Sequence, residues 1–240
     1  MNDNVATPTF NILSACSGIG GLDLGIHLAH TGARTVCYVE REGTSAAILA
    51  ARMRDRLLRE APIWSDLTTF SGEPWRGAVD CFAAGFPCQD VSLAGKGAGL
   101  KEGTRTGLWF ECARIIRETQ PGFVFLENVP GLVRRGLSRV LGDLDELGFD
   151  AEWGLFSAAG VGAPHSGNHT DGRRSCVWPP GPNEAEAWKG VPTEAQPAIC
   201  GVADGLPARN DRLRALGNGV VPLVAAHAFR TLADRLECQA

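Results

Sequence analysis

The fold is decided by residues 10–21, which read FNILSACSGIGG. The first six form a short apolar run that predicts a buried strand, and the glycines after it predict a tight turn into a helix over residues 20–29. Glycine lets the backbone turn sharply and approach a ligand, while the start of a helix offers free N–H groups. The segment therefore predicts a strand, a ligand-binding turn and a helix in succession.

The same alternation continues through the first two thirds of the chain. Further strands are expected at residues 35–39, 79–84 and 123–126, with helices over 44–59 and around 108–116. Strands that alternate with helices of this length imply right-handed crossovers and a mostly parallel sheet. We therefore predict an α/β fold.

The composition of the chain and its hydrophobic pattern change in the last third. Gly, Pro, Ala and polar residues dominate there, and a helical pattern returns only over residues 222–236. We predict a main domain over residues 1–160, a small irregular lobe over 161–208, and a C-terminal segment, 209–240, that returns to the main domain.

The composition limits the class of protein. The chain has 240 residues, of which 44% are hydrophobic and 21% charged, as in ordinary globular proteins. No apolar run approaches the roughly 20 residues that span a bilayer. Residues 1–9 lack the basic and then apolar order of a secretory signal, so we expect a cytoplasmic protein with no membrane contact.

Charge and cysteine content say less about function. The net charge of -4 gives no overall attraction to nucleic acid, although a local basic surface can still bind it. The eight cysteines are scattered without the spacing of a zinc or redox motif, so we expect no metal site.

Two acidic residues follow the glycine turn at positions that suit a nucleotide-type cofactor. Glu40 ends the second expected strand about 20 residues after the turn, where a carboxylate can accept hydrogen bonds from ribose hydroxyls. Asp66 follows the next helix and is placed to contact an adenine amino group. This pattern suits S-adenosylmethionine as well as NAD.

A cysteine and an acid are expected at the same sheet edge. Cys88 stands just past a strand end in the sequence GFPCQ, where a rigid proline holds it out of the core. Glu127 and Asn128 directly follow another apolar strand, in the sequence FLENVP. Both strands deliver these side chains to the carboxyl edge of the sheet.

At this point the sequence resembles the cytosine-5 DNA methyltransferases, especially their bacterial and phage members. The resemblance covers residues 10–165 and 212–236, with the motifs in the family's order. They are SGIGG at 17–21, PCQ at 87–89, ENV at 127–129, GAPH at 162–165 and GNGV at 217–220. The resemblance implies a Rossmann-like fold that uses S-adenosylmethionine.

The resemblance also implies roles for individual residues. Cys88 would attack carbon 6 of a cytosine flipped out of the duplex, and Glu127 would hydrogen-bond ring nitrogen 3 and the exocyclic amine. Asn128 would order the loop that carries Cys88. The implied cofactor contacts are Cys16, Gly18, Ile19, Gly20, Glu40, Arg41, Asp66, Leu67, Pro87, Leu108, Asn218 and Val220.

The implied macromolecular partner is double-stranded DNA. Gln89, Lys96 and Arg105 lie in a glycine-rich basic stretch that could close over DNA, and Arg173 and Arg174 are further candidates for DNA contact. A cognate restriction endonuclease is a candidate partner, and a monomer is the expected state.

The sequence departs from the family after residue 165. The family has two arginines there, whereas this chain reads SGNHTDG over 166–172 before Arg173 and Arg174. Residues 166–216 are also short for a target-recognition domain. The main alternative is thus a non-catalytic relic that binds S-adenosylmethionine and DNA. An RNA methyltransferase on the same scaffold is a further alternative, and an NAD-dependent dehydrogenase would leave Cys88 and Glu127 unexplained.

Overall fold

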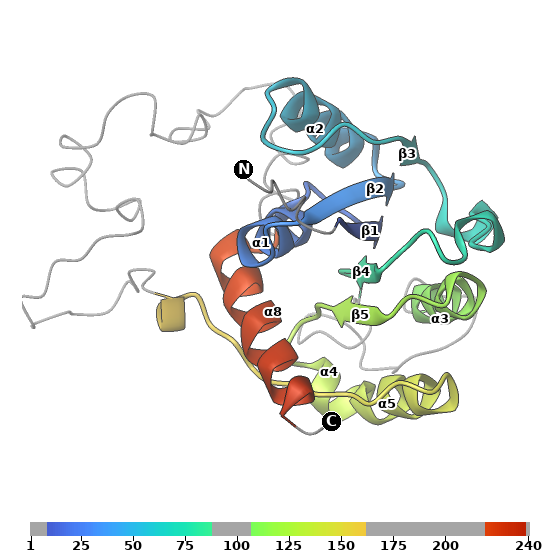
Figure 1. Ribbon diagram of the computed structural model, residues 1–240, viewed down its shortest axis with the longest axis vertical. Coiled ribbons are helices and arrows are strands. Elements are labelled where there is room, and N and C mark those ends of the chain that lie inside the picture. The colour runs from blue at the N-terminus through green and yellow to red at the C-terminus, as the bar shows by residue number, and fades with distance from the viewer. Residues whose placement is uncertain (1–8, 88–106, 162–218, 239–240) are drawn as a thin grey trace, which may run out of the picture.

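The structure, a computed structural model, describes residues 9–87, 107–161 and 219–238. Its centre is a parallel sheet in the order β3-β2-β1-β4-β5 (Figure 1). The strands are β1 (Phe10–Ala15), β2 (Ala33–Val39), β3 (Ile63–Trp64), β4 (Cys81–Ala84) and β5 (Phe123–Leu126). The predicted α/β fold with a mostly parallel, Rossmann-like sheet is confirmed.

Helices cover both faces of this sheet (Figure 1). One face packs against α1 and α8, and the other packs against α3 and α5. The α-helices are α1 (Gly21–Ala29), α2 (Gly43–Arg54), α3 (Leu108–Thr119), α4 (Leu132–Arg135), α5 (Leu137–Glu146) and α8 (Pro222–Glu237). Short 3-10 turns are η1 (Leu67–Thr69), η2 (Glu73–Trp75) and η4 (Ala159–Val161).

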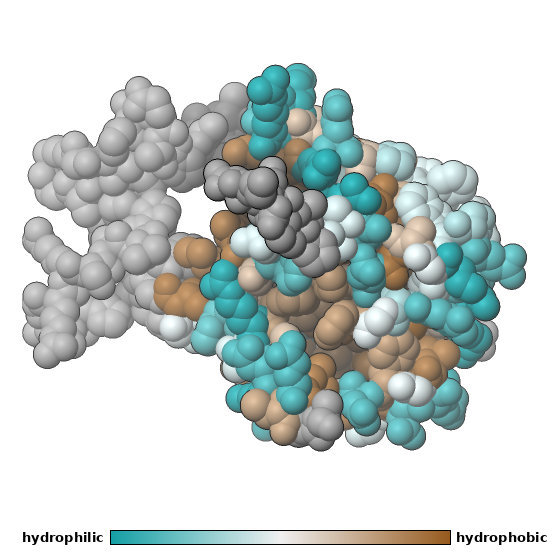
Figure 2. Space-filling model, in the orientation of Figure 1, coloured by the Kyte–Doolittle hydropathy of each residue, from teal (hydrophilic) through white to brown (hydrophobic). Residues whose placement is uncertain are grey.

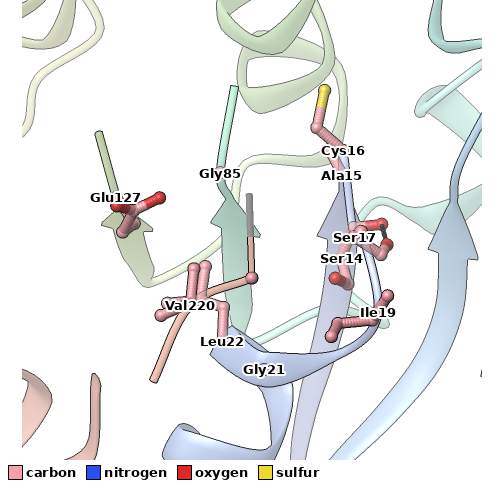
Figure 3. A pocket seen from close by; sticks show the side chains of 12 residues that line it. Ser14, Ala15, Cys16, Ser17, Ile19, Gly21, Leu22, Gly85, Glu127 and Val220 are labelled. Atoms are coloured by element: carbon pink, nitrogen blue, oxygen red, sulfur yellow. Dashed lines mark hydrogen bonds between the residues drawn. The ribbon is translucent and has the colours of Figure 1, made fainter. Parts of the chain in front are cut away.

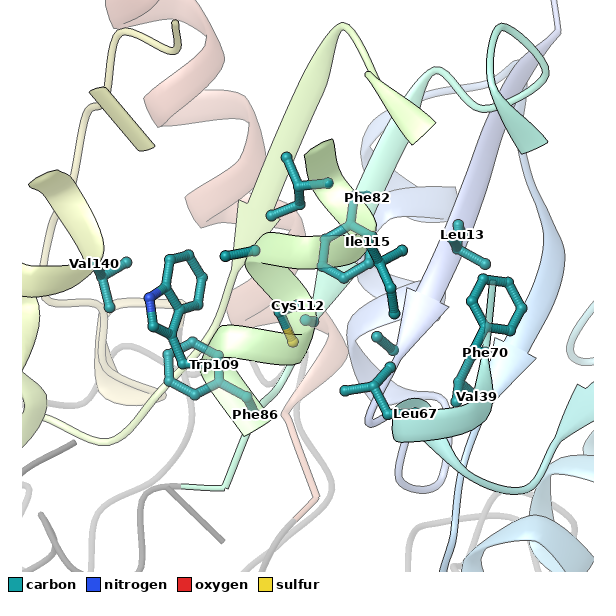
Figure 4. Close-up of a cluster of buried hydrophobic side chains, with 14 of the residues drawn as sticks. Leu13, Val39, Leu67, Phe70, Phe82, Phe86, Trp109, Cys112, Ile115 and Val140 are labelled. Carbon is teal, nitrogen blue, oxygen red and sulfur yellow. The ribbon is translucent and has the colours of Figure 1, made fainter. Parts of the chain in front are cut away.

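The larger part of the core lies between the sheet and α3 (Figure 4). Trp109, Cys112 and Ile115 are fully buried on one side of α3 and belong to the same cluster as Leu13 and Phe82 of the sheet. The indole N–H of Trp109 donates a 2.7 Å hydrogen bond to an Asp143 carboxylate oxygen on α5, so its polar atom has a partner. The apolar spacing in residues 108–116 thus produced the expected helix.

The C-terminal helix α8 packs closely on α1. A Cβ at Gly25 would lie 2.4 Å from the Cβ of Ala225, so the two helices approach at a point where only glycine fits. Ala225 and Ala228 also pack with Ile12 and Phe125 of the sheet. This contact carries the preceding residues, 219–221, to the glycine turn before α1.

The elements differ from the sequence prediction at several points; β2, for example, begins at Ala33, two residues earlier than expected. Helix α2 ends at Arg54 rather than at residue 59, because Arg56 takes a left-handed conformation (φ 60°) and the chain turns back. This turn lets Leu58 bury itself beneath the glycine turn. Strand β3 was not predicted, since two residues carry no periodicity. Strand β4 begins at Cys81, two residues later than expected.

The outer surface mixes polar and apolar side chains. Figure 2 shows hydrophilic residues interspersed with apolar ones on the visible face. Leu155 is the most exposed large apolar side chain among the described residues, at 69%. Within the described part of the chain, no helix is both long enough and apolar enough to cross a membrane.

Candidate active site

A pocket opens where the strand order changes direction. The chain runs from β1 outward through β2 and β3, then crosses to β4 on the other side of β1. In parallel α/β sheets, ligands bind at the carboxyl ends of strands beside such a switch. The pocket and the open solvent at its mouth together span about 350 Å³. It is lined by Ser14, Ala15, Cys16, Ser17, Gly18, Ile19, Gly21, Leu22, Gly85, Glu127, Gly219 and Val220.

The glycine turn, which is residues 16–20 between β1 and α1, forms one wall of this pocket (Figure 3). Cys16, Gly18 and Gly20 all have left-handed backbone conformations, with φ of 49°, 56° and 81°. A Cβ at Gly20 would lie 2.5 Å from a Leu58 methyl group, so a side chain is excluded there by both conformation and space. The Ser17 hydroxyl donates to the Ser14 carbonyl at 3.0 Å, which fastens the turn to the end of β1.

Glu40 holds the glycine turn against the end of β2. One of its carboxylate oxygens accepts a 2.7 Å hydrogen bond from the Gly18 N–H, and the other accepts a 2.7 Å bond from the Glu42 N–H. Burial raises the pKa of Glu40 above its ordinary value. Each oxygen keeps a second acceptor site, so Glu40 can support the turn and still receive a ligand hydroxyl.

Asp66 and Leu67 stand at the end of β3. Asp66 caps η1 by accepting hydrogen bonds from the Thr68 N–H at 2.9 Å and the Thr68 hydroxyl at 2.8 Å, and these bonds lower its pKa. The Leu67 side chain is buried in the core. Arg41 is exposed, and its charge is a smaller cause of the lowered pKa of Asp66. None of these three residues lines the described pocket.

Glu127 forms the opposite wall, at the end of β5 (Figure 3). A Cβ at Gly85 would lie 3.4 Å from a Glu127 carboxylate oxygen, so the absence of a side chain at Gly85 leaves space in front of the acid. Burial raises the pKa of Glu127 above its ordinary value. The structure thus brings Glu127 and the glycine turn together across one pocket.

Asn128 fixes the turn that follows β4. Its side-chain amide donates a 2.9 Å hydrogen bond to the Phe86 carbonyl oxygen, and its own oxygen accepts a 2.9 Å bond from the Val129 N–H. Phe86 is buried against Trp109, so this turn is held from two sides. Pro87, half-buried, comes next and is the last described residue of this stretch.

Some of the remaining predicted site residues are described by the structure, and others lie outside the described residues. Leu108 begins α3, packs against the core and does not line the described pocket, whereas Val220 does line it. Seven predicted site residues lie outside the described residues: Cys88, Gln89, Lys96, Arg105, Arg173, Arg174 and Asn218. The GAPH motif at 162–165 lies outside them as well.

Three residues that support the site were missed by the sequence reasoning. Arg52 on α2 donates to the Ile19 carbonyl of the glycine turn. Ser14 lines the pocket and donates to the fully buried Asp23. The one available signal was a charge at Asp23 within the apolar stretch GLDLGI, because a helix seldom turns an acid toward its core without a partner.

A family model for C-5 cytosine-specific DNA methylases matches residues 10–167. That stretch contains β1 to β5, the glycine turn and both walls of the pocket. The chain belongs to the C-5 cytosine-specific DNA methylase family. The family match confirms the resemblance over the four motifs that lie within residues 10–167, whereas GNGV at 217–220 lies beyond the matched residues.

Individual relatives match over the same region. The chain is 31% identical over 156 residues to the Type II methyltransferase M.Eco47II of Escherichia coli, covering 63% of this chain and 35% of that protein. It is 34% identical over 157 residues to M.NgoMIV of Neisseria gonorrhoeae, covering 64% of this chain and 47% of that one. The chain thus spans less than half the length of these curated relatives.

One solved structure matched to this chain is the S. pombe Dnmt2 methyltransferase. The TM-score is 0.44 at 16% identity, over 58% of this chain and 40% of that chain.

Within the described residues, no group of three or more His, Cys, Asp or Glu side chains is placed to hold a metal ion.

Proposed function

We propose that this chain transfers a methyl group from S-adenosylmethionine to carbon 5 of cytosine in double-stranded DNA. The observation that carries the proposal is the position of Glu127, which faces the glycine turn across the pocket and stands beside the turn leading to Cys88. An acid, a cysteine-bearing turn and a nucleotide-type cofactor turn are the three parts that this chemistry needs.

The residues around the glycine turn fit the proposed cofactor. The left-handed conformations at Cys16, Gly18 and Gly20 turn the backbone around the open end of β1, beside the start of α1. Glu40 stands at the adjacent strand end, and Val220 closes the pocket from the C-terminal segment. When bound there, S-adenosylmethionine would supply an activated methyl group to the pocket.

Glu127 would act on the cytosine ring. Its raised pKa favours the protonated carboxyl, which can donate a hydrogen bond to ring nitrogen 3 while its other oxygen accepts from the exocyclic amine. Such bonds stabilise the negative charge that builds in the ring when a nucleophile adds to carbon 6. Gly85 leaves the space that the ring edge needs in front of this carboxyl.

Cys88 would be the nucleophile. Its thiolate would form a bond to carbon 6 of a flipped cytosine, and carbon 5 would then act as the nucleophile. Carbon 5 would take the methyl group as the sulfur–methyl bond breaks, and S-adenosylhomocysteine would be the leaving group. Loss of the carbon 5 proton to a base and return of the electron pair would break the carbon–sulfur bond and free Cys88. Asn128 supports this role because it anchors the Phe86 carbonyl, two residues before the thiol.

The DNA contacts are proposed on sequence grounds alone. Gln89, Lys96, Arg105, Arg173 and Arg174 are the candidates, with their cations meeting phosphates. We further propose a cytoplasmic monomer that works beside a cognate restriction endonuclease, as the Type II names of the relatives suggest. The alternative of a non-catalytic relic rests on residues 166–172, SGNHTDG, a stretch without arginine where the family carries two.

A covalent trap tests the proposal. The chain would be incubated with S-adenosylmethionine and duplex DNA libraries that contain 5-fluorocytosine, whose fluorine blocks the release of the nucleophile. We expect a DNA adduct that survives denaturing electrophoresis in the wild type and is absent from Cys88→Ser. Cys238→Ser, which changes an exposed cysteine far along the chain, should trap like the wild type. Cofactor binding without any adduct would support the relic instead.

A further inference from the structure

A carboxylate is buried directly behind the glycine turn. Asp23, in the first turn of α1, is 0% exposed. It accepts a 2.9 Å hydrogen bond from the Ser14 hydroxyl on β1 and another, also 2.9 Å, from the Thr35 hydroxyl on β2. One side chain therefore joins a helix and two strands at the base of the pocket.

Among the described residues, no positive side chain pairs with this carboxylate. Of the ion pairs within the described residues, none includes Asp23. His27 lies near the Thr35 hydroxyl, but burial and the charge of Arg59 lower the pKa of His27, so it is neutral at pH 7. The other titratable neighbours are Tyr38 of β2 and Cys81 of β4; burial, and then the charge of Asp23, raise the pKa of both.

The buried charge is unfavourable for folding. Burial raises the pKa of Asp23 to about 6, so the group is mostly ionised at neutral pH while lacking a counter-charge. An uncompensated buried carboxylate opposes folding, and a neutral side chain of the same shape would not. Strongly perturbed acids of this kind gather at functional sites. Its location therefore suggests a role in the pocket rather than in stability.

We infer that Asp23 is a positioning residue of the proposed cofactor site, which holds Ser14 and the glycine turn in the conformation that receives S-adenosylmethionine. An ionised carboxylate only accepts hydrogen bonds, so it fixes the Ser14 hydroxyl with its proton toward Asp23. The Ser14 carbonyl in turn accepts the Ser17 hydroxyl at 3.0 Å. This chain of bonds runs from Asp23 into the pocket wall.

The charge of Asp23 has a second effect on the same ligand. S-adenosylmethionine carries a positive sulfonium and a positive ammonium group, and a negative charge in a low-dielectric wall attracts cations strongly. Within the described residues, Ser14 both lines the pocket and donates a hydrogen bond to Asp23, so it lies between the carboxylate and the ligand space. The inference rests on the proposed function, because it assumes this cofactor in this pocket.

The test is cofactor affinity measured by isothermal titration calorimetry on the full chain. We expect Asp23→Asn to raise the Kd for S-adenosylmethionine about tenfold at pH 7.5, the effect of one charge-assisted hydrogen bond. The same variant should have a higher Tm at this pH, because it removes a buried charge. Thr119→Val is the matched control, since it removes a fully buried hydroxyl that donates within α3, and it should leave the Kd unchanged.

A pH profile separates this role from simple packing. The wild-type Kd should rise as the pH falls through about 6, where Asp23 takes up a proton. Glu40 and Glu127 also have raised pKa values, so the readout is the difference between the wild type and Asp23→Asn. That difference should shrink below pH 6.

Three results would overturn the inference, and they can be told apart. If the wild type binds no S-adenosylmethionine, the proposed function fails and this inference fails with it. If the wild type binds and Asp23→Asn binds equally well at every pH, the inference alone fails. Should Asp23→Asn not fold, Ser14→Ala decides, because it cuts the link while leaving Asp23 in place; an unchanged Kd in that variant would also overturn the inference.

Discussion

The side-chain amide of Asn128 donates a 2.9 Å hydrogen bond to the carbonyl oxygen of Phe86. This bond joins the end of β5 to the turn after β4, two residues before the proposed nucleophile. The position of Cys88 would therefore depend on β5, because Asn128, the residue after Glu127, holds the turn that leads to Cys88.

Removal of this bond should slow the chemical step. Asn128→Ala frees the Phe86 carbonyl, and a misplaced nucleophile can lower the rate roughly 10- to 100-fold. We expect kcat to fall by that amount while the Kd for S-adenosylmethionine stays the same, as measured by tritium transfer to DNA. Asn11→Ala is the control, since its amide donates a similar 2.8 Å bond to the Ala78 carbonyl at the other end of the sheet. Equal losses of kcat in both variants would contradict the prediction.

The contact between Gly21 and the C-terminal segment should be intolerant of any side chain. A Cβ at Gly21 would lie 2.2 Å from the Val220 carbonyl oxygen, which is backbone and cannot swing away. Gly21→Ala should lower the free energy of unfolding by about 1–3 kcal/mol and weaken cofactor binding, because Val220 closes the pocket. Urea denaturation and calorimetric titration measure the two effects.

Gly142→Ala is the matched control for that substitution. Nothing lies within 4 Å of a Cβ at Gly142, an exposed position inside α5. Alanine is favoured over glycine in a helix, so this variant should gain about 0.5–1 kcal/mol and bind the cofactor normally. A loss of stability in Gly142→Ala would contradict this prediction, because it would mean that another part of the protein contacts α5 at this position.

The main frame of the site could be predicted from sequence because it is local. Apolar runs fixed β1 and β5 to the residue, and the glycines and acids that follow strand ends fell at the carboxyl edge, as parallel sheets require. The predicted helix Pro222–Leu236 likewise appears as α8. Each of these depends on a pattern within about ten residues.

The supports of the site could not be predicted, because they join residues far apart in the chain. Arg52 reaches Ile19, and Thr35 reaches Asp23, only after helices and strands have packed. The early end of α2 has the same origin, since Leu58 turns back to fill the space beside Gly20. Tertiary packing here overrides a helical pattern that continues in the sequence.

Glu40 should be sensitive to loss of one acceptor oxygen. In Glu40→Gln, the new NH₂ group would face either the Gly18 N–H or the Glu42 N–H, and two donors repel each other. We expect a loss of about 1–3 kcal/mol in unfolding free energy and a raised Kd for S-adenosylmethionine. Glu73→Gln changes an exposed acid at the start of η2 and should do neither. Calorimetric titration and urea denaturation of both variants check this.

Asp23 should make stability depend on pH in an unusual direction. Its pKa is raised from 3.8 to about 6 in the folded protein, so the folded state holds this proton more tightly than the unfolded chain does. The stability that protonated Asp23 contributes is full below pH 3.8 and is lost as the pH rises through about 6. Most paired carboxylates behave in the opposite way.

The comparison with Asp23→Asn isolates this effect from the other acids. At pH 7.5 the variant should be more stable than the wild type, because it lacks the buried charge. Lowering the pH to 4 should remove roughly 2–3 kcal/mol of that advantage, since one pKa unit corresponds to about 1.4 kcal/mol. Urea unfolding at several pH values measures the difference. A difference that stays constant across the range would show that Asp23 has an ordinary pKa in the folded protein and that its carboxylate is not desolvated.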